Sequence, residues 1–460
     1  MKNALWLAVC VVAVAATYAP QLGAPLELQD DHRIIEPALA PHAGALRMWI
    51  AAIEQDVHEV GRFRPVNQIF DVCLPLVLGP NAFAWHLLSL LLAVAVTVLL
   101  YIAAWKLWHS PMAAALFALV TMLAPDPGPA ATWYRLGPKE AWGMLFLAGA
   151  LLCMVVRRDV LAFVLVVLMA LSKESFLLLV PALFAVHLWL GGRKKLRPLA
   201  VAYGVLFATG CIAILIVMRS AGAHSYGGQS LAITPKSIAL TLFRDIVRAP
   251  SLAVWFLPVI LAWRRITIPA IVLFALWIGP QYLLYGTRGG MWDHYWLPCV
   301  VAFAGANAAA VATLAPLWRR IALAAFAIWC INAVRVDVCA VRNFGMRAAV
   351  QQQAVRIAAE HLTPQSRLVV LGGPREMGEI ASAFVEFVRF DGGRFRDALL
   401  LAPGSAIADA DVVVHLDQKE RPVLPGFERT YATGPQTFLS LRKRGWVTLP
   451  FSLAVDLKKR

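Results

Sequence analysis

The chain has 460 residues, of which 60% are hydrophobic, and a mean hydropathy of +0.68. A soluble protein of this length could not bury so much apolar surface, so the composition excludes that class and predicts a polytopic membrane protein. The formal net charge of +15 does not indicate a nucleic-acid partner, because the basic residues are scattered in short loops between apolar runs. The seven cysteines are dispersed without metal-ligand or disulfide-framework spacing, which indicates buried apolar side chains.

Apolar runs predict an α-helical protein with about eleven membrane-spanning helices. These runs lie at about 4–20, 83–105, 111–125, 140–156, 160–172, 175–190, 199–218, 251–263, 266–284, 296–317 and 321–338. The first run follows Lys2 and resembles a signal peptide. We expect it to remain as the first span, because the rest of the topology agrees with a cytoplasmic N-terminus.

The distribution of charge predicts the orientation in the membrane. With the N-terminus in the cytoplasm, nearly every loop on that side is short and basic, as the positive-inside rule requires. These loops are Lys106–Ser110, Arg157–Asp159, Gly191–Pro198, Trp263–Arg265 and Trp318–Arg320. All the longer loops and the C-terminal tail then face outward, which we interpret as the periplasmic side of a bacterial inner (cytoplasmic) membrane.

The first outer loop, residues 21–82, carries an acidic pair, Asp30 and Asp31. A carboxylate in this place can accept a proton from a hydroxyl, or bind a divalent cation through oxygen. Adjacent side chains diverge, so one is expected to face the chemistry and the other to support it. The alternative to a catalytic role is that the two aspartates lie in a solvated loop and cap the N-terminus of a helix. We also expect amphipathic helices in this loop.

Basic residues at the outer ends of spans are candidates for binding phosphate. Arg62 and Arg64 lie where the first loop returns to the membrane, and a guanidinium pairs bidentately with phosphate. Their alternative role is to anchor the chain at lipid headgroups. The stretch Trp133–Glu140 adds Arg135 and Lys139, with an interfacial aromatic belt as the alternative.

Two further segments carry charge at outer span ends. Lys173 and Glu174 lie between two apolar runs, where charges are costly and therefore functional candidates, unless they pair with each other in a turn. The glycine-rich, aromatic stretch Tyr285–Trp296 adds Arg288 and His294. Both are candidates for phosphate, and a second aromatic belt is again the alternative.

The tail after residue 340 predicts a small α/β domain without a site of its own. The pattern indicates a helix at Val341–His361, strands at Arg367–Leu371 and Asp411–Leu416, a turn at Gly372–Pro374 and a helix at Glu376–Val388. We therefore divide the chain into a transmembrane domain, residues 1–340, which carries the candidate chemistry, and a periplasmic α/β domain, residues 341–460.

Several of these motifs together resemble the GT-C superfamily of integral membrane glycosyltransferases. They are Asp30-Asp31-His32-Arg33, Arg62-Phe63-Arg64-Pro65-Val66, Ala84-Trp85-His86-Leu87-Leu88 and Leu171-Ser172-Lys173-Glu174-Ser175. The resemblance covers about residues 1–190 in order, spacing and predicted side of the membrane. It is closest to the bacterial, polyprenyl-phosphate-sugar-dependent O-mannosyltransferase and aminoarabinose transferase group.

The resemblance implies transfer of a sugar from polyprenyl phosphate, such as undecaprenyl phosphate, to a hydroxyl of a lipid, glycan or protein, with inversion. It also implies that Asp30 or Asp31 is the base, with Asp30 slightly preferred. Relatives often carry a His-Pro-x-His-x-Glu-like segment that is replaced here by Ala124–Pro129. Asp126 or Glu140 could substitute, which leaves a Mg²⁺ or Mn²⁺ cofactor open, with these two acids and the acidic pair as candidate ligands.

Other functions remain as alternatives. A polysaccharide polymerase or ligase usually places its key arginines in a late loop, whereas here the acid-rich loop comes early. A transporter or flippase is expected to show mid-membrane charges or repeated halves. A non-catalytic partner that uses its tail for assembly is a third possibility. Because the ionisable residues gather at outer span ends, we favour a transferase of cell-envelope glycan biosynthesis, with membrane lipids as its surroundings.

Overall fold

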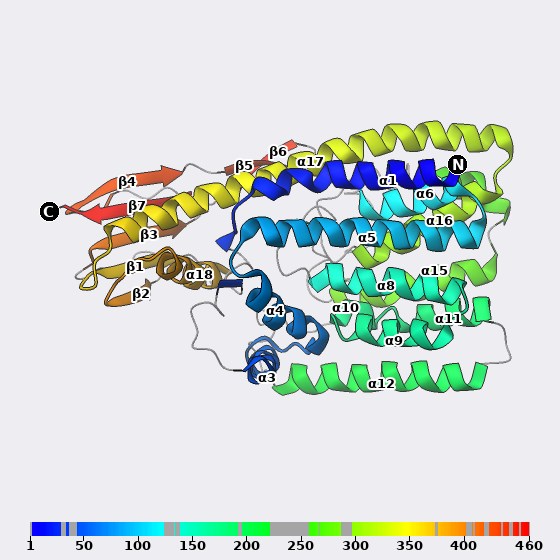
Figure 1. Cartoon of the computed structure of the whole chain (residues 1–460), viewed down its shortest axis with the longest axis horizontal. Helices are drawn as coiled ribbons and strands as arrows, with labels where there is room; N and C mark the ends of the chain where they lie inside the picture. Colours follow the sequence, from blue (N-terminus) through cyan, green and yellow to red (C-terminus); the bar gives the residue numbers. More distant parts are fainter. Residues whose placement is uncertain are drawn as a thin grey trace.

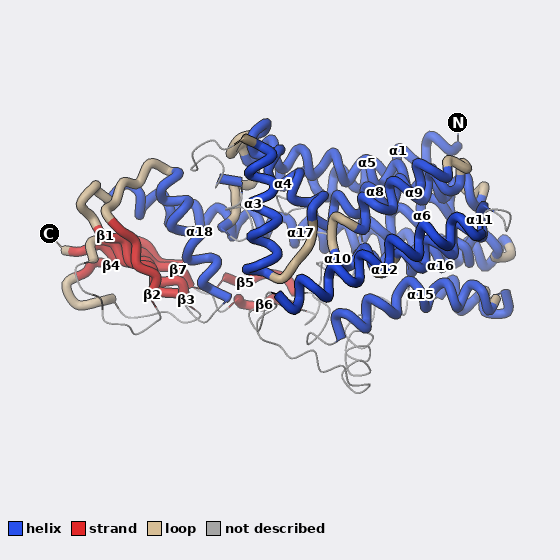
Figure 2. The backbone as a smooth tube through the Cα atoms, turned by 90° about the horizontal axis from the view of Figure 1, so that it is seen from below, coloured by secondary structure: helices blue, strands red, loops and turns tan. Residues whose placement is uncertain are grey.

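The computed structural model describes residues 2–28, 34–35, 44–123, 133, 139–191, 196–220, 257–265, 267–286, 297–372, 376–401, 407, 410–417, 423–433, 436–440, 445–449 and 452–459. A bundle of long helices makes up most of the molecule (Figure 1). A small β-sheet domain lies at one end of the bundle, and Figure 2 shows the same division from a perpendicular direction.

The apolar helices of the bundle agree with most of the predicted runs. They are α1 (Lys2–Tyr18), α5 (Ala82–Trp108), α6 (Pro111–Met122), α8 (Lys139–Val155), α9 (Asp159–Ala170), α11 (Val180–Gly191), α12 (Leu196–Ser220), α15 (Ile268–Gly286), α16 (Leu297–Thr313) and α17 (Pro316–His361). The run 251–263 lies partly outside the described residues, and the predicted span 321–338 and the predicted helix Val341–His361 form one continuous helix. A short 3₁₀ turn, η5, spans Trp263–Arg265. In the described residues, four helices are long and apolar enough to cross a membrane, and seven apolar helices are shorter. The chain is thus a helical membrane protein, whereas the number of eleven spans remains a prediction.

Local sequence signals explain where several of these helices begin and end. Asn81 caps α5, since its Oδ1 accepts a hydrogen bond from the backbone N–H of Ala84 at 3.3 Å. His109 ends α5 with a left-handed φ of 50°. Ser110 then caps α6, and Pro111 occupies the first turn of that helix, where a backbone N–H is not needed.

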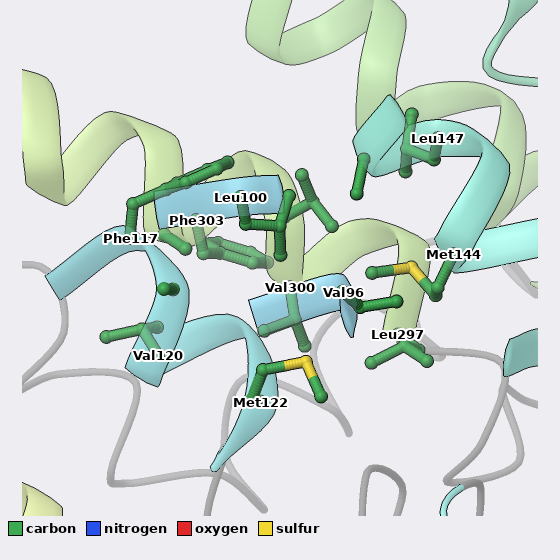
Figure 3. Packing of buried hydrophobic residues seen from close by; sticks show 14 of the residues in the cluster. Val96, Leu100, Phe117, Val120, Met122, Met144, Leu147, Leu297, Val300 and Phe303 are labelled. Carbon is green, nitrogen blue, oxygen red and sulfur yellow. The ribbon is translucent and has the colours of Figure 1, made fainter. Parts of the chain in front are cut away.

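The bundle core is continuous and tightly packed. Val96 and Leu100 of α5, Phe117 of α6, and Val300 and Phe303 of α16 meet in one cluster (Figure 3). Three consecutive alanines of α6 are almost fully buried, which allows neighbouring backbones to approach closely. The result is a rigid bundle that can hold polar groups at its end.

The first outer loop contains helices, as predicted. They are η1 (Ala19–Gly23), α3 (Ala45–Gln55), the π-helical turn η2 (Asp56–Val60) and α4 (Pro65–Leu78). The indole of Trp49 on α3 donates to the carbonyl of Pro65 at 2.9 Å, while Leu46 and Ile50 are exposed. Apolar side chains on the outer face of α3 are expected for a helix at a membrane surface.

One helix, α17, connects the bundle to the sheet domain (Figure 1). It has 46 residues and contains no proline after its first turn. At a rise of 1.5 Å per residue, its length is about 69 Å, more than twice the hydrocarbon core of a bilayer. The helix continues through residue 340, where we place the domain boundary. The two domains are therefore joined by a stiff element.

The C-terminal domain is a five-stranded sheet with the order β2-β1-β3-β7-β4. Its strands are β1 (Arg367–Gly372), β2 (Asp397–Leu401), β3 (Val412–Asp417), β4 (Phe427–Thr433) and β7 (Ser452–Lys458), while β5 (Gln436–Ser440) and β6 (Gly445–Leu449) form a separate hairpin. The strand β1 pairs in parallel with β2 and β3, and β7 pairs antiparallel with β3 and β4.

Helix α18 (Glu376–Phe390) connects β1 to β2 and packs with α17 on one face of the sheet. The predicted α/β architecture, the two predicted strands and the predicted helix between them are confirmed. The predicted turn before α18 includes residues 373 and 374, which lie outside the described residues.

Candidate active site

Arg64 and Glu174 form a buried ion pair between the first outer loop and the bundle. Arg64 immediately precedes α4, and Glu174 opens the short helix α10 (Glu174–Leu177). The Arg64 Nε donates to Glu174 Oε2 at 2.7 Å and its Nη2 donates to Oε1 at 3.0 Å. The two side chains are only 2% and 7% exposed. This bidentate, charge-assisted geometry fixes the start of α4 against α10.

The preceding residue, Lys173, forms a second buried ion pair. Its Nζ donates to the carboxylate of Glu140 in the first turn of α8. The backbone at Lys173 is extended, so successive side chains point in opposite directions. Lys173 therefore reaches α8 while Glu174 reaches α4. Each of these two residues has a partner on another element, and together they tie three helices at one end of the bundle.

Asp56 and Gln68 form a buried polar pair beside Arg62 that was not predicted from the sequence. Gly61 has a left-handed φ of 70°, which glycine adopts without strain, and turns the chain between η2 and α4. The backbone N–H of Arg62 then donates to the Asp56 carbonyl at 2.9 Å. The Gln68 side chain donates to the Asp56 carboxylate, and both are buried. Polar residues at the start of an apolar helix were the only sequence signal for this pair.

Gln281 of α15 was also missed, although it contacts the same region. Its Nε2 donates to the backbone carbonyl of Ser175 at 2.5 Å, and its side chain is fully buried. Its Oε1 has no hydrogen-bond partner in the structure as described. A glutamine within the predicted apolar run 266–284 was the available signal, since buried amides in membrane helices usually have a polar partner. Gln281 thus adds a polar side chain behind α10.

Most of the other predicted site residues cannot be placed relative to this cluster, because the structure does not describe their side chains. Those that lie outside the described residues are Asp30, Asp31, Asp126, Arg135, Arg288 and His294. Lys139 is described only through its backbone, as the first residue of α8. Among the described ranges, no three or more His, Cys, Asp or Glu side chains are grouped to hold a metal ion. The metal hypothesis, including Glu140 as a ligand, therefore rests on the sequence.

A separate buried polar cluster lies on the sheet. Burial by itself raises the pKa of Asp456, but hydrogen bonds from His415 Nε2 at 2.9 Å and Arg429 Nε at 2.8 Å outweigh it and hold that pKa below its usual value. On the exposed edge, hydrogen bonds from Arg367 likewise lower the pKa of the Asp397 carboxyl. Both carboxylates therefore contribute to the fold of this domain in their ionised form.

No protein-family model matches the sequence, and no curated protein sequence matches it. Two solved structures are similar in fold. The crystal structure of ArnT from Cupriavidus metallidurans bound to undecaprenyl phosphate has a TM-score of 0.55 and 12% identity, and the match covers 90% of this chain and 92% of that chain. The apo state of the same protein has a TM-score of 0.53 and 13% identity, with 90% and 93% covered. The chain therefore shares the fold of ArnT over about nine-tenths of its length, and this is the fold that the resemblance of its motifs implied.

Proposed function

We propose that this protein is a glycosyltransferase that moves a sugar from a polyprenyl-phosphate donor to a hydroxyl of a lipid, glycan or protein acceptor. The observation that carries the proposal is the shared fold, which covers nine-tenths of this chain and of an ArnT structure bound to undecaprenyl phosphate. Transfer would occur on the periplasmic face of the inner membrane, with the N-terminus in the cytoplasm. The charge distribution of the loops supports this orientation.

The proposed reaction needs one base and several cations. The acceptor oxygen attacks the anomeric carbon, the bond from that carbon to the phosphate oxygen breaks, and polyprenyl phosphate leaves with the electron pair. Asp30 or Asp31 takes the hydroxyl proton as general base. Attack on the side opposite the phosphate inverts the configuration. Preorganised cations stabilise the charge on the leaving phosphate.

The two buried ion pairs, Arg64–Glu174 and Lys173–Glu140, change the roles that we propose for Arg64 and Lys173. The candidates for the phosphate are Arg62, Arg64, Arg135, Lys139, Lys173, Arg288 and His294. Arg64 and Lys173 already hold buried carboxylates, so phosphate binding through them requires those hydrogen bonds to be shared or exchanged. We therefore assign these two cations chiefly to shaping the site, with Glu174 as the partner of Arg64. A divalent cation, Mg²⁺ or Mn²⁺, remains a proposed cofactor.

The test is sugar transfer by the purified full-length protein in lipid nanodiscs. The substrate is a radiolabelled pool of polyprenyl-phosphate sugars, and label is counted in lipid, glycan and protein fractions, with and without EDTA. Asp30→Asn and Asp31→Asn are compared with Asp391→Asn, which removes an exposed carboxylate of the C-terminal domain. The variant that removes the base is expected to be about 100-fold slower than the wild type, because general acid–base catalysis contributes about that much.

Two results would contradict the proposal. If the wild-type protein transfers no label from a pool that a known transferase can use, the transferase function is wrong. If Asp30→Asn, Asp31→Asn and the double variant all match the wild type, the acidic pair is not the base. Movement of label across the bilayer of closed proteoliposomes, without transfer, would instead indicate a flippase.

A further inference from the structure

The chain that leads to the acidic pair is held by helix α17. The backbone N–H of Leu28 donates to Gln351 Oε1 at 3.0 Å, and Gln352 Nε2 donates to the carbonyl of Leu26 at 2.9 Å. The carboxylate of Glu27, between them, pairs with Arg347. Three successive residues of the first loop are therefore bound by three side chains from one face of α17.

Apolar contacts hold the chain on both sides of the acidic pair. Leu28 before the pair and Ile35 after it are fully buried, and Ile34 is nearly so. All three belong to the same core cluster as Val355 of α17 and Phe384 of α18. This cluster also contains the inward-facing residues of β1, β3 and β7. The described residues on either side of the acidic pair are thus anchored in the core of the C-terminal domain, which is far from them in the sequence.

The direction of each glutamine amide follows from its backbone partner. A backbone N–H can only donate, so Gln351 must accept through oxygen, and a carbonyl can only accept, so Gln352 must donate through nitrogen. Gln351 and Gln352 are 3% and 9% exposed. Losing such a buried bond leaves a backbone group unsatisfied, which is costly. The neighbouring Gln353 is exposed and makes a matched control.

We propose that Arg347, Gln351 and Gln352 are positioning residues that set the place of the acidic pair, so that the C-terminal domain is part of the machinery for transfer. This inference rests on the function proposed above. A base must lie within hydrogen-bond reach of the hydroxyl it deprotonates. A misplacement of about 1 Å can slow an enzyme about 100-fold. Contacts that fix residues 26–28 therefore control the rate without touching the substrate.

The experiment makes the same change at three consecutive positions. Gln352→Glu replaces the amide donor by a carboxylate facing a carbonyl, whereas Gln351→Glu keeps an acceptor for the Leu28 N–H. Gln353→Glu adds the same charge on the exposed face. Turnover is measured with the radiolabelled polyprenyl-phosphate sugar pool and divided by the number of sites that bind radiolabelled undecaprenyl phosphate. This ratio corrects for protein that has not folded.

We expect Gln352→Glu to lower turnover per donor-binding site at least tenfold, with an unchanged affinity for undecaprenyl phosphate. Gln351→Glu and Gln353→Glu should remain within threefold of the wild type. Gln351→Leu, which removes the acceptor, should behave like Gln352→Glu. If Gln352→Glu is not recovered as folded protein, the inference is tested by comparing turnover per donor-binding site between Gln351→Leu and Gln351→Glu.

The outcomes separate this inference from the proposed function. If the wild type is active, the acidic-pair variants are inactive, and all four glutamine variants match the wild type, the positioning role is wrong and the transferase function stands. If the glutamine variants lose turnover only in proportion to their donor-binding sites, their role is structural and the inference is overturned. If the wild type transfers no sugar, the inference falls together with the function.

Discussion

At the scale of single residues, Lys173 and Glu174 show how two adjacent charges can serve different parts of a protein. The sequence identified both as ionisable residues next to apolar runs, but it could not identify their partners. Lys173 pairs with a residue 33 positions away and Glu174 with one 110 positions away. Pairings over such distances depend on how helices pack, which no local pattern encodes.

Removing one partner of the buried Arg64 pair is expected to destabilise the protein. Glu174→Gln leaves the guanidinium buried beside a neutral side chain, which costs about 3–5 kcal/mol when a buried pair is broken. The double variant Arg64→Met/Glu174→Met removes both charges and should recover most of that loss. Thermal unfolding in detergent measures both effects. An unchanged melting temperature for Glu174→Gln would show that the pair carries no stability.

The Asp456 carboxylate makes the stability of the sheet domain depend on pH. Its pKa is lowered in the folded state, so its stabilisation is complete above the unfolded pKa of about 3.9 and is lost as the pH falls through the lower folded value. The penalty of Asp456→Asn should therefore be largest near pH 7 and shrink towards pH 2.

Amide hydrogen exchange of peptides from β3 and β7, corrected for intrinsic rates, measures this penalty. Asp397→Asn is the control, because its ion pairs are exposed to solvent and should contribute little to stability. A penalty of the same size at pH 7 and pH 2 would contradict the role of the ionised carboxylate.

At the scale of helices and strands, the elements that the sequence predicted are those with a continuous physical signal. Apolar runs located the bundle helices, and β1 and β3 were found because central parallel strands are buried on both faces. The edge strands β2 and β4 were missed, because neither carries a buried run. The strand β7 was also missed, although it is central in the sheet and its residues 453–456 are buried. The contacts of α17 with residues 26–28 were also beyond the sequence, since they join side chains more than 300 positions apart.

Close packing of α8 against α10 gives a prediction at this scale. A Cβ at Gly143 would overlap with the ring of Phe176, and a clash in a well-packed core typically costs about 1–3 kcal/mol. Gly143→Ala is therefore expected to push α10 away from α8, lower the melting temperature and weaken the Lys173 pair. Gly204→Ala on α12 has no atom within 4 Å of the added Cβ and should be neutral or stabilising. Equal melting temperatures for the two variants would contradict this packing argument.

At the scale of the whole molecule, the alternation of short basic loops and long mixed loops predicts which side each end of the bundle faces. Alkaline phosphatase fused after residue 459 should be active, because that reporter folds only in the oxidising periplasm. The same reporter fused at residue 158 should be inactive, and a green fluorescent protein fused there should fluoresce. The reverse pattern would invert the topology and would move the proposed site to the cytoplasmic face.

Because α17 is uninterrupted, a change of its tilt in the membrane should move its far end. A helix embedded in a bilayer tilts when the hydrocarbon thickness changes. Because a straight helix of 46 residues is about 69 Å long, a tilt of about 5° moves its far end by about 6 Å. The far end of α17 binds residues 26–28 of the first loop and packs on one face of the sheet. The acyl-chain length of the surrounding lipid should therefore change the tilt of α17 and, with it, the position of the first loop. We expect turnover to be highest in bilayers whose thickness requires no change in that tilt.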